Sequence, residues 1–397
     1  MKILVIHNSY LERGGEDEVV KSEIKLLKSY GHEIVEYRRS NKEMESFSFL
    51  RKIYVLLKEI IWSQDSYEAV KELIIKEKPD IAHIHNIFLL ISPSVYYALS
   101  EGNVPIVQTL HNYRLICPKG ILYRNGMICE KCLQGNILHS VINKCWRDSF
   151  FLTSALARIL CKFCKKRDFL DKISAYVALG DFSKKKFVEA GFPSEKVFIK
   201  PNFVDIDTLN MRDGFEDYAV FVGRLVDYKG VLTLVDAFKT LGNYHLKIIG
   251  DGPLLGELKT KIEKIETIDL LGRMTNDKAR DYMRRAAFTI LPSECYESTP
   301  RVIIESFSCG VPVLVSNRAF KGESVEEHNV GLEFIAGDSN SLADKVRYLM
   351  ENRQSLAEMG KNAFIIYQEK YTAQKNYESL IEIYNKAIEL HEKHKNN

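Results

Sequence analysis

Short runs rich in valine and isoleucine alternate with segments of helical periodicity along the whole chain. Such alternation is typical of βαβ units, in which parallel strands lie in a sheet covered by helices. In the first half we expect strands at residues 3–7, 33–37, 81–85, 106–109, 175–178 and 197–199. In the second half we expect them at residues 218–222, 245–249, 268–271, 288–291 and 312–315. The pattern predicts an α/β protein with two Rossmann-like halves.

Length and composition limit the class of protein further. With 397 residues the chain exceeds one typical hydrophobic core, so two domains are expected. Its net charge of +3 is small and argues against a dedicated nucleic-acid binder. The start shows no basic leader with a long apolar run, and no apolar run approaches the roughly 20 residues that span a bilayer. We therefore expect a cytoplasmic protein whose eight cysteines are thiols or metal ligands, not disulfides.

Residues 293–316 carry two glutamates, Glu297 and Glu305, with seven residues between them. Ser298, Thr299 and Pro300 are expected to supply capping hydroxyls and a proline suited to a helix start. An anion at that start would meet free backbone N–H groups and the positive end of the helix dipole. An anionic group beside acceptors for hydroxyls describes a nucleotide sugar.

Two cations lie upstream of the glutamates, in a turn that follows the expected strand at 218–222. Arg224 and Lys229 there suit a diphosphate, whose charge must be held while it departs. Taken alone, ordinary surface salt bridges explain these two side chains as well. Residues 246–253 and 268–274 repeat the pattern of a strand followed by a glycine turn.

Together these segments resemble the retaining glycosyltransferases of family 4, which have the GT-B fold. Residues 2–20 look like that family's opening strand and glycine turn, and residues 197–205 resemble its interdomain crossover. The resemblance implies two Rossmann-like, doubly wound domains that face each other across a cleft. It places an acceptor-side domain at residues 1–200, a nucleotide-sugar domain at 201–373, and a last helix at 374–397 that crosses back to the first domain.

The resemblance also implies roles for four catalytic candidates. Glu297 matches the glutamate that contacts the donor sugar hydroxyls and steadies positive charge at the anomeric carbon. Arg224 and Lys229 match the diphosphate clamp, and His111 lies near the 6-position of the sugar. The alternative for each is structural: solvated carboxylates, surface cations and a packed histidine.

A larger set is expected to bind the donor, with Glu305 accepting hydrogen bonds from the ribose hydroxyls. Residues 298–302 replace the more usual Gly-Phe-Gly of the family, and Pro300 lacks an N–H, which leaves open which backbone donors meet the phosphate. The full set is Gly15, Gly250, Gly252, Arg273, Met274, Ser298, Thr299, Pro300, Arg301, Val302 and Glu305. His83 and His85 share one strand face, where packing or acceptor contact is expected.

The implied reaction transfers a sugar from a nucleotide-sugar donor to a hydroxyl of a saccharide or lipid-linked saccharide, with retention at the anomeric carbon. No metal or other cofactor takes part in the chemistry, because the basic clamp holds the diphosphate. Surface polysaccharide biosynthesis is the expected setting. Two alternatives stay open: a nucleotide-sugar epimerase on the same fold, and a non-catalytic sugar-nucleotide sensor or zinc-organised scaffold.

A cysteine-containing insert is expected at residues 115–146. Cys117, Cys129, Cys132 and Cys145 fall within 30 residues, which suits a tetrahedral structural zinc site, and a subset of the family looks similar here. Asn125-Gly126 predicts a tight hairpin that brings Cys117 and Cys129 together. The alternative is a set of buried free thiols. Cys161 and Cys164 have helical spacing and are expected to pack in a core.

Two segments have the composition of a membrane-surface helix. Residues 47–62 are apolar with basic residues interspersed, and residues 161–167 are basic. Such segments lie on the inner, anionic face of a bilayer in peripheral proteins. Core helices with a solvated edge explain them equally well.

Overall fold

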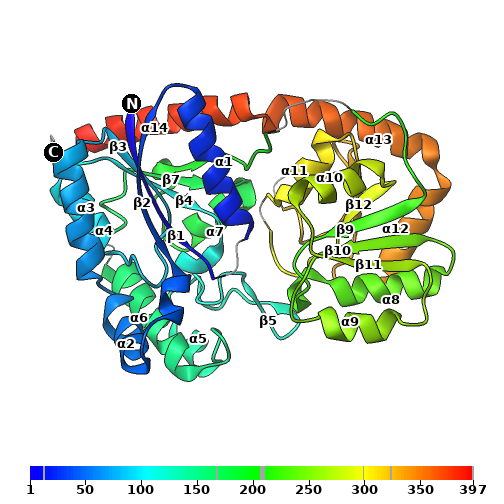
Figure 1. Cartoon of the computed structure of the whole chain (residues 1–397), viewed down its shortest axis with the longest axis horizontal. Helices are drawn as coiled ribbons and strands as arrows, with labels where there is room; N and C mark the ends of the chain where they lie inside the picture. Colours follow the sequence, from blue (N-terminus) through cyan, green and yellow to red (C-terminus); the bar gives the residue numbers. More distant parts are fainter. Residues whose placement is uncertain (12–13, 167–168, 206–210, 298, 322–323, 396–397) are drawn as a thin grey trace. The chain divides into compact units, whose positions relative to one another are not determined.

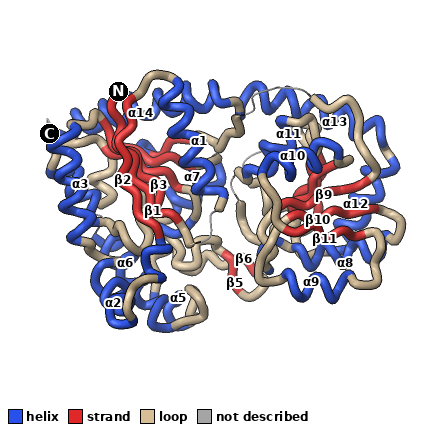
Figure 2. Tube along the Cα trace, in the orientation of Figure 1, coloured by secondary structure: helices blue, strands red, loops and turns tan. Residues whose placement is uncertain are grey.

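The computed structural model describes residues 1–11, 14–166, 169–205, 211–297, 299–321 and 324–395, and the side chains of residues 161–166 are outside the description. The chain divides into two compact units, each built on a parallel sheet (Figures 1 and 2). Unit 1 comprises Met1–Leu122, Cys129–Pro201 and Asn376–Asn397. Unit 2 comprises Tyr123–Ile128 and Asn202–Lys375.

Unit 1 contains a six-stranded sheet in the order β2-β1-β3-β4-β7-β8, with every neighbouring pair parallel. Its strands are β1 (Lys2–Ser9), β2 (Glu33–Ser40), β3 (Ile81–Asn86), β4 (Ile106–Leu110), β7 (Ala175–Ala178) and β8 (Val197–Ile199). The strand order reverses between β1 and β3, so the crevice beyond their carboxyl ends is where a doubly wound sheet binds ligands.

Helices cover both faces of this sheet (Figure 1). They are α1 (Gly15–Ser29), α2 (Phe49–Tyr54), η2 (Val55–Glu59), α3 (Gln64–Glu77), α4 (Ser94–Glu101), α5 (Leu138–Ile142), α6 (Phe150–Lys166), α7 (Asp181–Glu189) and the last helix, α14 (Ala373–Lys395), with short 3₁₀ turns at Asn41–Glu45, Tyr113–Leu115 and Ser194–Lys196. Val20 and Leu27 of α1 and Leu380 of α14 pack in one buried cluster with Ile3 and Ile81 of the sheet. The last helix therefore completes the core of unit 1.

Unit 2 contains a second six-stranded parallel sheet, in the order β11-β10-β9-β12-β13-β14. Its strands are β9 (Tyr218–Val222), β10 (His245–Ile249), β11 (Ile268–Gly272), β12 (Phe288–Leu291), β13 (Val313–Ser316) and β14 (Gly331–Phe334). Its helices are η5 (Asp227–Lys229), α8 (Val231–Leu241), α9 (Leu255–Ile262), α10 (Asn276–Arg285), α11 (Arg301–Ser308), α12 (Ser339–Glu351), α13 (Arg353–Ile366) and η6 (Tyr367–Tyr371). This is the Rossmann strand order, with its switch point between β9 and β12.

The expected hairpin in the cysteine insert is present. It joins β5 (Tyr123–Arg124) to β6 (Met127–Ile128), which pair antiparallel. Asn125 and Gly126 have φ values of 50° and 75°, as a type I′ turn requires. Within unit 2, Tyr123 Oη donates a hydrogen bond of 2.8 Å to Glu294 Oε2.

All eleven expected strands occur, and β14 is an additional one that the sequence did not suggest. β14 lies at the edge of its sheet and has the sequence Gly-Leu-Glu-Phe, which lacks the run of valine and isoleucine that marks buried strands. No helix in the described part of the chain is long and apolar enough to cross a membrane.

Candidate functional site

In unit 2 a close backbone approach joins the two loops at the switch point of the sheet. Gly230 follows η5, after β9, and adopts a left-handed φ of +68°. A Cβ at this position would lie 1.9 Å from the carbonyl oxygen of Pro292, in the loop after β12. Only glycine satisfies both constraints. The sequence Lys-Gly therefore brings the η5 turn against the loop that carries Glu297.

Lys229 and Glu297 form an ion pair across this junction, with Lys229 Nζ 2.7 Å from Glu297 Oε2. Ser293 Oγ also donates a hydrogen bond to Glu297 Oε1. Burial alone would lower the pKa of Lys229, but the adjacent Glu297 carboxylate raises it, and the net shift is upward. The lysine therefore stays charged, and the carboxylate is held by two donors.

Helix α11 begins beside this pair, and its N-cap residue provides no side-chain cap. Pro300 occupies the N-cap position and makes no capping hydrogen bond, so the expected hydroxyl cap is absent there. Thr299 is buried, and its carbonyl accepts a 3.0 Å hydrogen bond from Asn202 Nδ2, while Ser298 lies outside the described residues. The first N–H groups of the helix therefore have no side-chain acceptor at the N-cap, which suits an anion.

Glu305 lies one turn along α11 and accepts a 3.2 Å hydrogen bond from Arg301. The two residues are four positions apart, so they share one side of the helix. Val302 and Met274 instead pack against a buried cluster that includes Val220 of β9. These two side chains thus have a clear packing role, whereas Arg273 is exposed.

Gly250 and Gly252 have a steric reason to be glycine. Their φ values are +152° and +159°, and an added Cβ would lie 1.8 Å from Gly223 O and 2.5 Å from Leu225 O, respectively. These glycines pack the loop after β10 onto the loop after β9. Between the two contacted residues lies Arg224, whose side chain is exposed.

In unit 1 the corresponding end of the sheet carries Gly15 and a carboxyl that the sequence did not single out. Gly15 is the first residue of α1, and a Cβ there would meet no atom of the described residues within 4 Å. Glu16 follows it and accepts a 3.3 Å hydrogen bond from Asn112 Nδ2. Burial, and then the neighbouring Asp17, raise the pKa of Glu16 to about 8. Glu16 and His111 line the same recess.

His111, which is half-buried, contacts a network of buried histidines. His85 Nδ1 lies 2.9 Å from His111 Nε2, and His83 bonds Tyr384 Oη and Thr109 Oγ1, each at 2.7 Å. Burial lowers the pKa of His83 to about 4 and that of His111 to about 3. Both rings are therefore neutral at physiological pH. As expected, His83 and His85 share a face, where they pack against each other with ring centroids 4.2 Å apart.

A buried carboxylate lies beneath these rings. Glu23 Oε2 is 2.8 Å from Lys200 Nζ, and both side chains are 2% exposed. Three potential metal ligands meet here, because donor atoms of Glu23, His83 and His85 all lie within 4.8 Å of one another. In the described part of the chain this is the group of three or more such ligands that lies so close together. Lys200 already neutralises the carboxylate, and both ring nitrogens of His83 are bonded, so the network fits an internal salt bridge better than a metal ion.

Comparison with known families identifies the chain. Residues 13–208 match the family described as Glycosyltransferase Family 4, and residues 210–366 match the family described as Glycosyl transferases group 1. These two matches run through nearly the whole sequence. The chain belongs to the family 4, group 1 glycosyltransferases.

Relatives of this family 4 chain include a putative glycosyltransferase, EpsF, of Bacillus subtilis. It is 25% identical over 62% of this chain and 67% of its own length. A putative teichuronic acid biosynthesis glycosyltransferase of the same organism, TuaC, is 29% identical over 40% of this chain and 42% of its own. An uncharacterized glycosyltransferase of Methanocaldococcus jannaschii is 32% identical over 38% of this chain and 43% of its own. The match thus spans less than half of two of these relatives.

Solved structures agree with the fold of the family 4 chain. HepE of Anabaena, crystallised in complex with UDP, has a TM-score of 0.67 at 17% identity, over 96% of this chain and 99% of its own. Sucrose-phosphate synthase of Thermosynechococcus elongatus has a TM-score of 0.70 at 14% identity, over 97% and 98%. Two parallel-sheet Rossmann-like units and these neighbours establish the GT-B fold class.

The other three cysteines of the insert lie near Cys132, but the four sulfurs of the insert do not form a compact group. Cys117 and Cys132 are buried, Cys129 and Cys145 are partly exposed, and all four are free thiols. Burial raises the pKa of Cys132 to about 12, and the other three thiols add to the rise. Among the described residues, no three of their sulfurs lie within 4.8 Å of one another. The side chains of Cys161 and Cys164 lie outside the description.

Proposed function

We propose that this chain is a retaining glycosyltransferase that moves a sugar from a nucleotide-sugar donor to a hydroxyl of a saccharide or lipid-linked saccharide. The observation that carries the proposal is the Lys229–Glu297 ion pair, which lies at the switch point of the unit 2 sheet beside the uncapped start of α11. Ligands of doubly wound sheets bind at that place, and a helix start attracts phosphate.

In this proposal the donor diphosphate binds the N–H groups at the start of α11 together with Lys229 and Arg224. The incoming phosphate replaces Glu297 as the partner of Lys229, which frees the carboxylate to accept hydrogen bonds from the sugar hydroxyls. Glu305, one turn along the helix, accepts from the ribose. Since the two cations hold the charge of the leaving diphosphate, the chemistry needs no metal ion.

The other predicted donor residues have supporting roles in this proposal. Gly15 leaves the backbone open to phosphate or acceptor, and neutral His111 hydrogen bonds the sugar near its 6-position. Arg273 lies near the base or the phosphates, and the first turn of α11, with Arg301, borders the diphosphate. Gly250 and Gly252 shape the loop beside Arg224, while Val302 and Met274 support the site through packing.

A structural zinc ion completes the proposal. Cys117, Cys129, Cys132 and Cys145 would hold it through four thiolates, which fill a tetrahedral shell and leave no position for a catalytic water. Support comes from the spacing of the cysteines in the sequence and from the closeness of the other three thiols to Cys132, whose pKa they help to raise. The ion would stabilise the insert and take no part in transfer.

We place the activity in surface polysaccharide biosynthesis, at the cytoplasmic face of the membrane. Relatives whose names refer to teichuronic acid and amylovoran biosynthesis support this setting. The amylovoran relative, from Erwinia amylovora, is 26% identical over 40% of this chain. A lipid-linked saccharide in the inner leaflet is the acceptor that such a setting offers.

A panel of nucleotide sugars tests the proposal, beginning with UDP-sugars because HepE was crystallised with UDP. A ligand at 100 times its dissociation constant should stabilise the protein by about 2.7 kcal/mol in thermal unfolding. The stabilising donor is then incubated with acceptors, and NMR of the product reports the anomeric configuration. Inversion would refute retention, and formation of an epimer without acceptor would favour an epimerase. Absence of stabilisation by every donor would refute the nucleotide-sugar site.

A further inference from the structure

Unit 1 has a cluster of exposed apolar side chains at one end, formed by three short segments. Seven of the eighteen exposed large hydrophobic residues in the described part of the chain fall within the twenty residues of 49–54 and 138–151. Phe49 and Leu50 are 76% and 77% exposed, and Ile142 is 74% exposed. The apolar patch consists of Phe49, Leu50, Tyr54, Leu138, Ile142, Phe150 and Phe151.

The elements that carry the patch pack against one another. Helix α5 contacts α6, and α6 contacts η2, which continues directly from α2. Figures 1 and 2 show α2, α5 and α6 together at one end of unit 1. The apolar side chains of these helices therefore belong to one region of the surface.

Helix α5 is apolar on two sides, which a helix folded only into its own unit does not require. Ile137 and Val141 turn inward and join a buried cluster with Ala157 and Leu160 of α6. Leu138 and Ile142, each one position further along, are 69% and 74% exposed. The second apolar side thus faces away from the core of unit 1.

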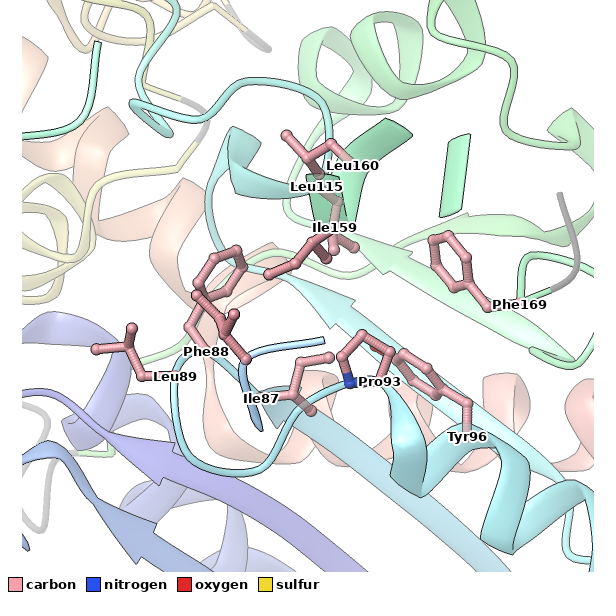
Figure 3. A pocket seen from close by; sticks show the side chains of 10 residues that line it. Ile87, Phe88, Leu89, Pro93, Tyr96, Leu115, Ile159, Leu160 and Phe169 are labelled. Atoms are coloured by element: carbon pink, nitrogen blue, oxygen red, sulfur yellow. The ribbon is translucent and has the colours of Figure 1, made fainter. Parts of the chain in front are cut away.

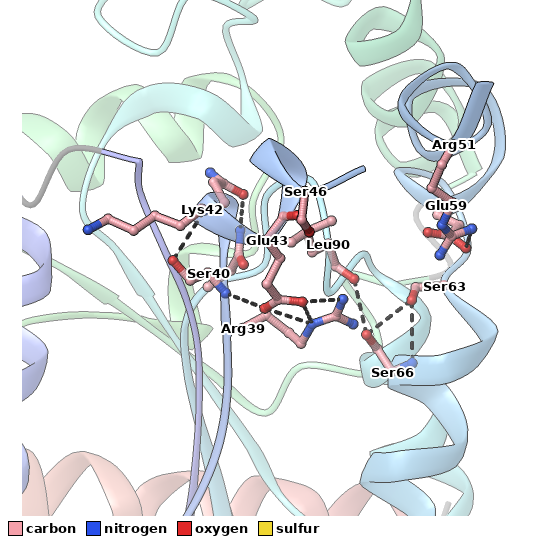
Figure 4. A network of polar contacts seen from close by, with 12 residues as sticks. Arg39, Ser40, Lys42, Glu43, Ser46, Arg51, Glu59, Ser63, Ser66 and Leu90 are labelled. Carbon is pink, nitrogen blue, oxygen red and sulfur yellow. Dashed lines mark hydrogen bonds and ion pairs between the residues drawn. The ribbon is translucent and has the colours of Figure 1, made fainter. Parts of the chain in front are cut away.

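Two polar contacts anchor α2 within unit 1. Ser48 caps the helix, and Arg51 forms a 2.5 Å ion pair with Glu59 at the end of η2. Nearby, Ser66 Oγ donates to the carbonyl of Leu90 at 3.1 Å (Figure 4). None of the residues of α2 is buried, and Phe49 and Leu50 are among the most exposed apolar side chains in the described part of the chain.

The charges around the patch are mostly positive. Residues 47–62 and 138–160 contain six basic and two acidic residues, an excess of four, whereas the whole chain carries +3. Lys58, Lys144, Arg147 and Arg158 are exposed. Aromatic and aliphatic side chains among lysines and arginines complement an anionic lipid surface, which attracts basic residues by about 1 kcal/mol each.

Unit 1 also contains an apolar recess (Figure 3). Ile60, which follows η2, and Ile159 and Leu160 of α6 line it together with Phe88 and Tyr96. Phe88 and Tyr96 also line the polar recess that contains His111 and Glu16. The two recesses therefore share lining residues, and the apolar one is lined in part by α6, which also carries Phe150 and Phe151 of the patch.

We infer that the apolar patch docks unit 1 on an anionic phospholipid bilayer, with Phe49, Leu50, Leu138 and Ile142 entering the interface. This inference rests on the proposed function, because it places the protein where a lipid-linked acceptor resides. The aromatic side chains of α6 deepen the contact, and the surrounding lysines orient it.

Co-sedimentation of the full chain with vesicles tests the inference. Vesicles of phosphatidylglycerol and phosphatidylethanolamine should bind the protein, and pure phosphatidylcholine vesicles should bind it much less. The double variants Phe49→Ser/Leu50→Ser and Leu138→Ser/Ile142→Ser should each lower partitioning by roughly tenfold, because apolar area no longer leaves water. Lys58→Gln and Lys144→Gln should lower it by about fivefold each at low salt.

The matched control is Ile75→Ser/Ile365→Ser, which removes exposed apolar side chains from α3 and α13, outside the patch. It should bind vesicles like the unchanged protein. Circular dichroism and thermal midpoints check that each variant folds. Binding of UDP to the unchanged protein, measured without vesicles, separates the two proposals. If UDP does not bind, the donor site is refuted, while the inference about the apolar patch still stands on its vesicle binding.

Equal binding to neutral and anionic vesicles, or unchanged binding by both double variants, would overturn the inference. So would a concentration-dependent dimer that the patch variants convert to monomers without any vesicle binding. In that case a second copy of the chain, not lipid, covers the patch.

Discussion

Lys229 Nζ lies 2.7 Å from Glu297 Oε2, across the two loops that leave the switch-point strands of unit 2. In this pair each charge has a partner of opposite sign. A bound diphosphate would compete with Glu297 for the lysine, so donor binding and release of the carboxylate are coupled in the proposed mechanism. Substitution of each partner in turn separates the two effects.

Replacing Glu297 by glutamine should remove most transfer activity and leave nucleotide binding nearly intact. The amide keeps the size of the side chain but can no longer steady positive charge at the anomeric carbon. Turnover of the donor identified in the stabilisation panel, and binding of UDP to the same variant, measure the two effects. Near-normal turnover would contradict the role of Glu297.

Arg224→Ala and Lys229→Ala should each lower turnover by roughly 10²–10³, because each removes a cation from the leaving diphosphate. The matched control is Lys239→Ala, an exposed lysine on α8, which should have no effect. Activity of the unchanged enzyme, freshly chelated and still folded, should not require magnesium or manganese. Restoration of lost activity by either ion would show that the clamp does not replace a metal.

The strands were predictable from sequence, whereas the close contacts of the site were not. Valine and isoleucine runs marked eleven strands because buried parallel strands need them on both faces. The approach of Gly230 to Pro292 O joins residues 62 positions apart in sequence, and no local pattern encodes it. Glu23 was missed because a single glutamate in a helix normally lies in solvent. A signal that could point to a buried partner for Glu23 is Lys200, a lysine placed between a strand and a proline.

The buried pair of Glu23 and Lys200 gives a prediction about stability. Lys200→Met should cost about 3–5 kcal/mol of unfolding free energy, because it leaves a buried carboxylate without its cation. The double variant Glu23→Leu/Lys200→Met should lose less than the sum of the single variants. Urea unfolding of the four proteins completes the cycle. Additive losses would mean that the two side chains do not interact.

The neutral histidines predict a loss of stability in acid. Burial lowers the pKa of His83 to about 4, below its ordinary value of 6.5, so the unfolded chain binds more protons between these values. Unfolding free energy should therefore fall as the pH drops from 6.5 towards 4. His83→Gln should flatten this slope in urea titrations, and an unchanged slope would assign the acid sensitivity to other groups.

Glu16 predicts the opposite trend on the alkaline side. Burial raises its pKa to about 8 in the folded protein, above the ordinary value of 4.5, so the folded chain holds the extra proton between these values. Its contribution to stability is present at low pH and is lost as the pH rises to 8. Glu16→Gln should gain stability relative to the unchanged protein from pH 6 to 9. Glu18→Gln, on the same turn of α1, is the control and should show no such gain.

The four cysteines of the insert should bind one zinc ion per chain. Replacing Cys129 and Cys132 by serine would leave two thiolates, too few for a closed tetrahedral site. The insert should then become sensitive to protease, while unit 2 still binds nucleotide. Cys295→Ser is the control, since this buried cysteine lies in unit 2, outside the insert. Elemental analysis of protein purified without added metal decides the matter. Zinc well below one per chain, with all four thiols reacting freely in the native protein, would show that these cysteines are not a metal site.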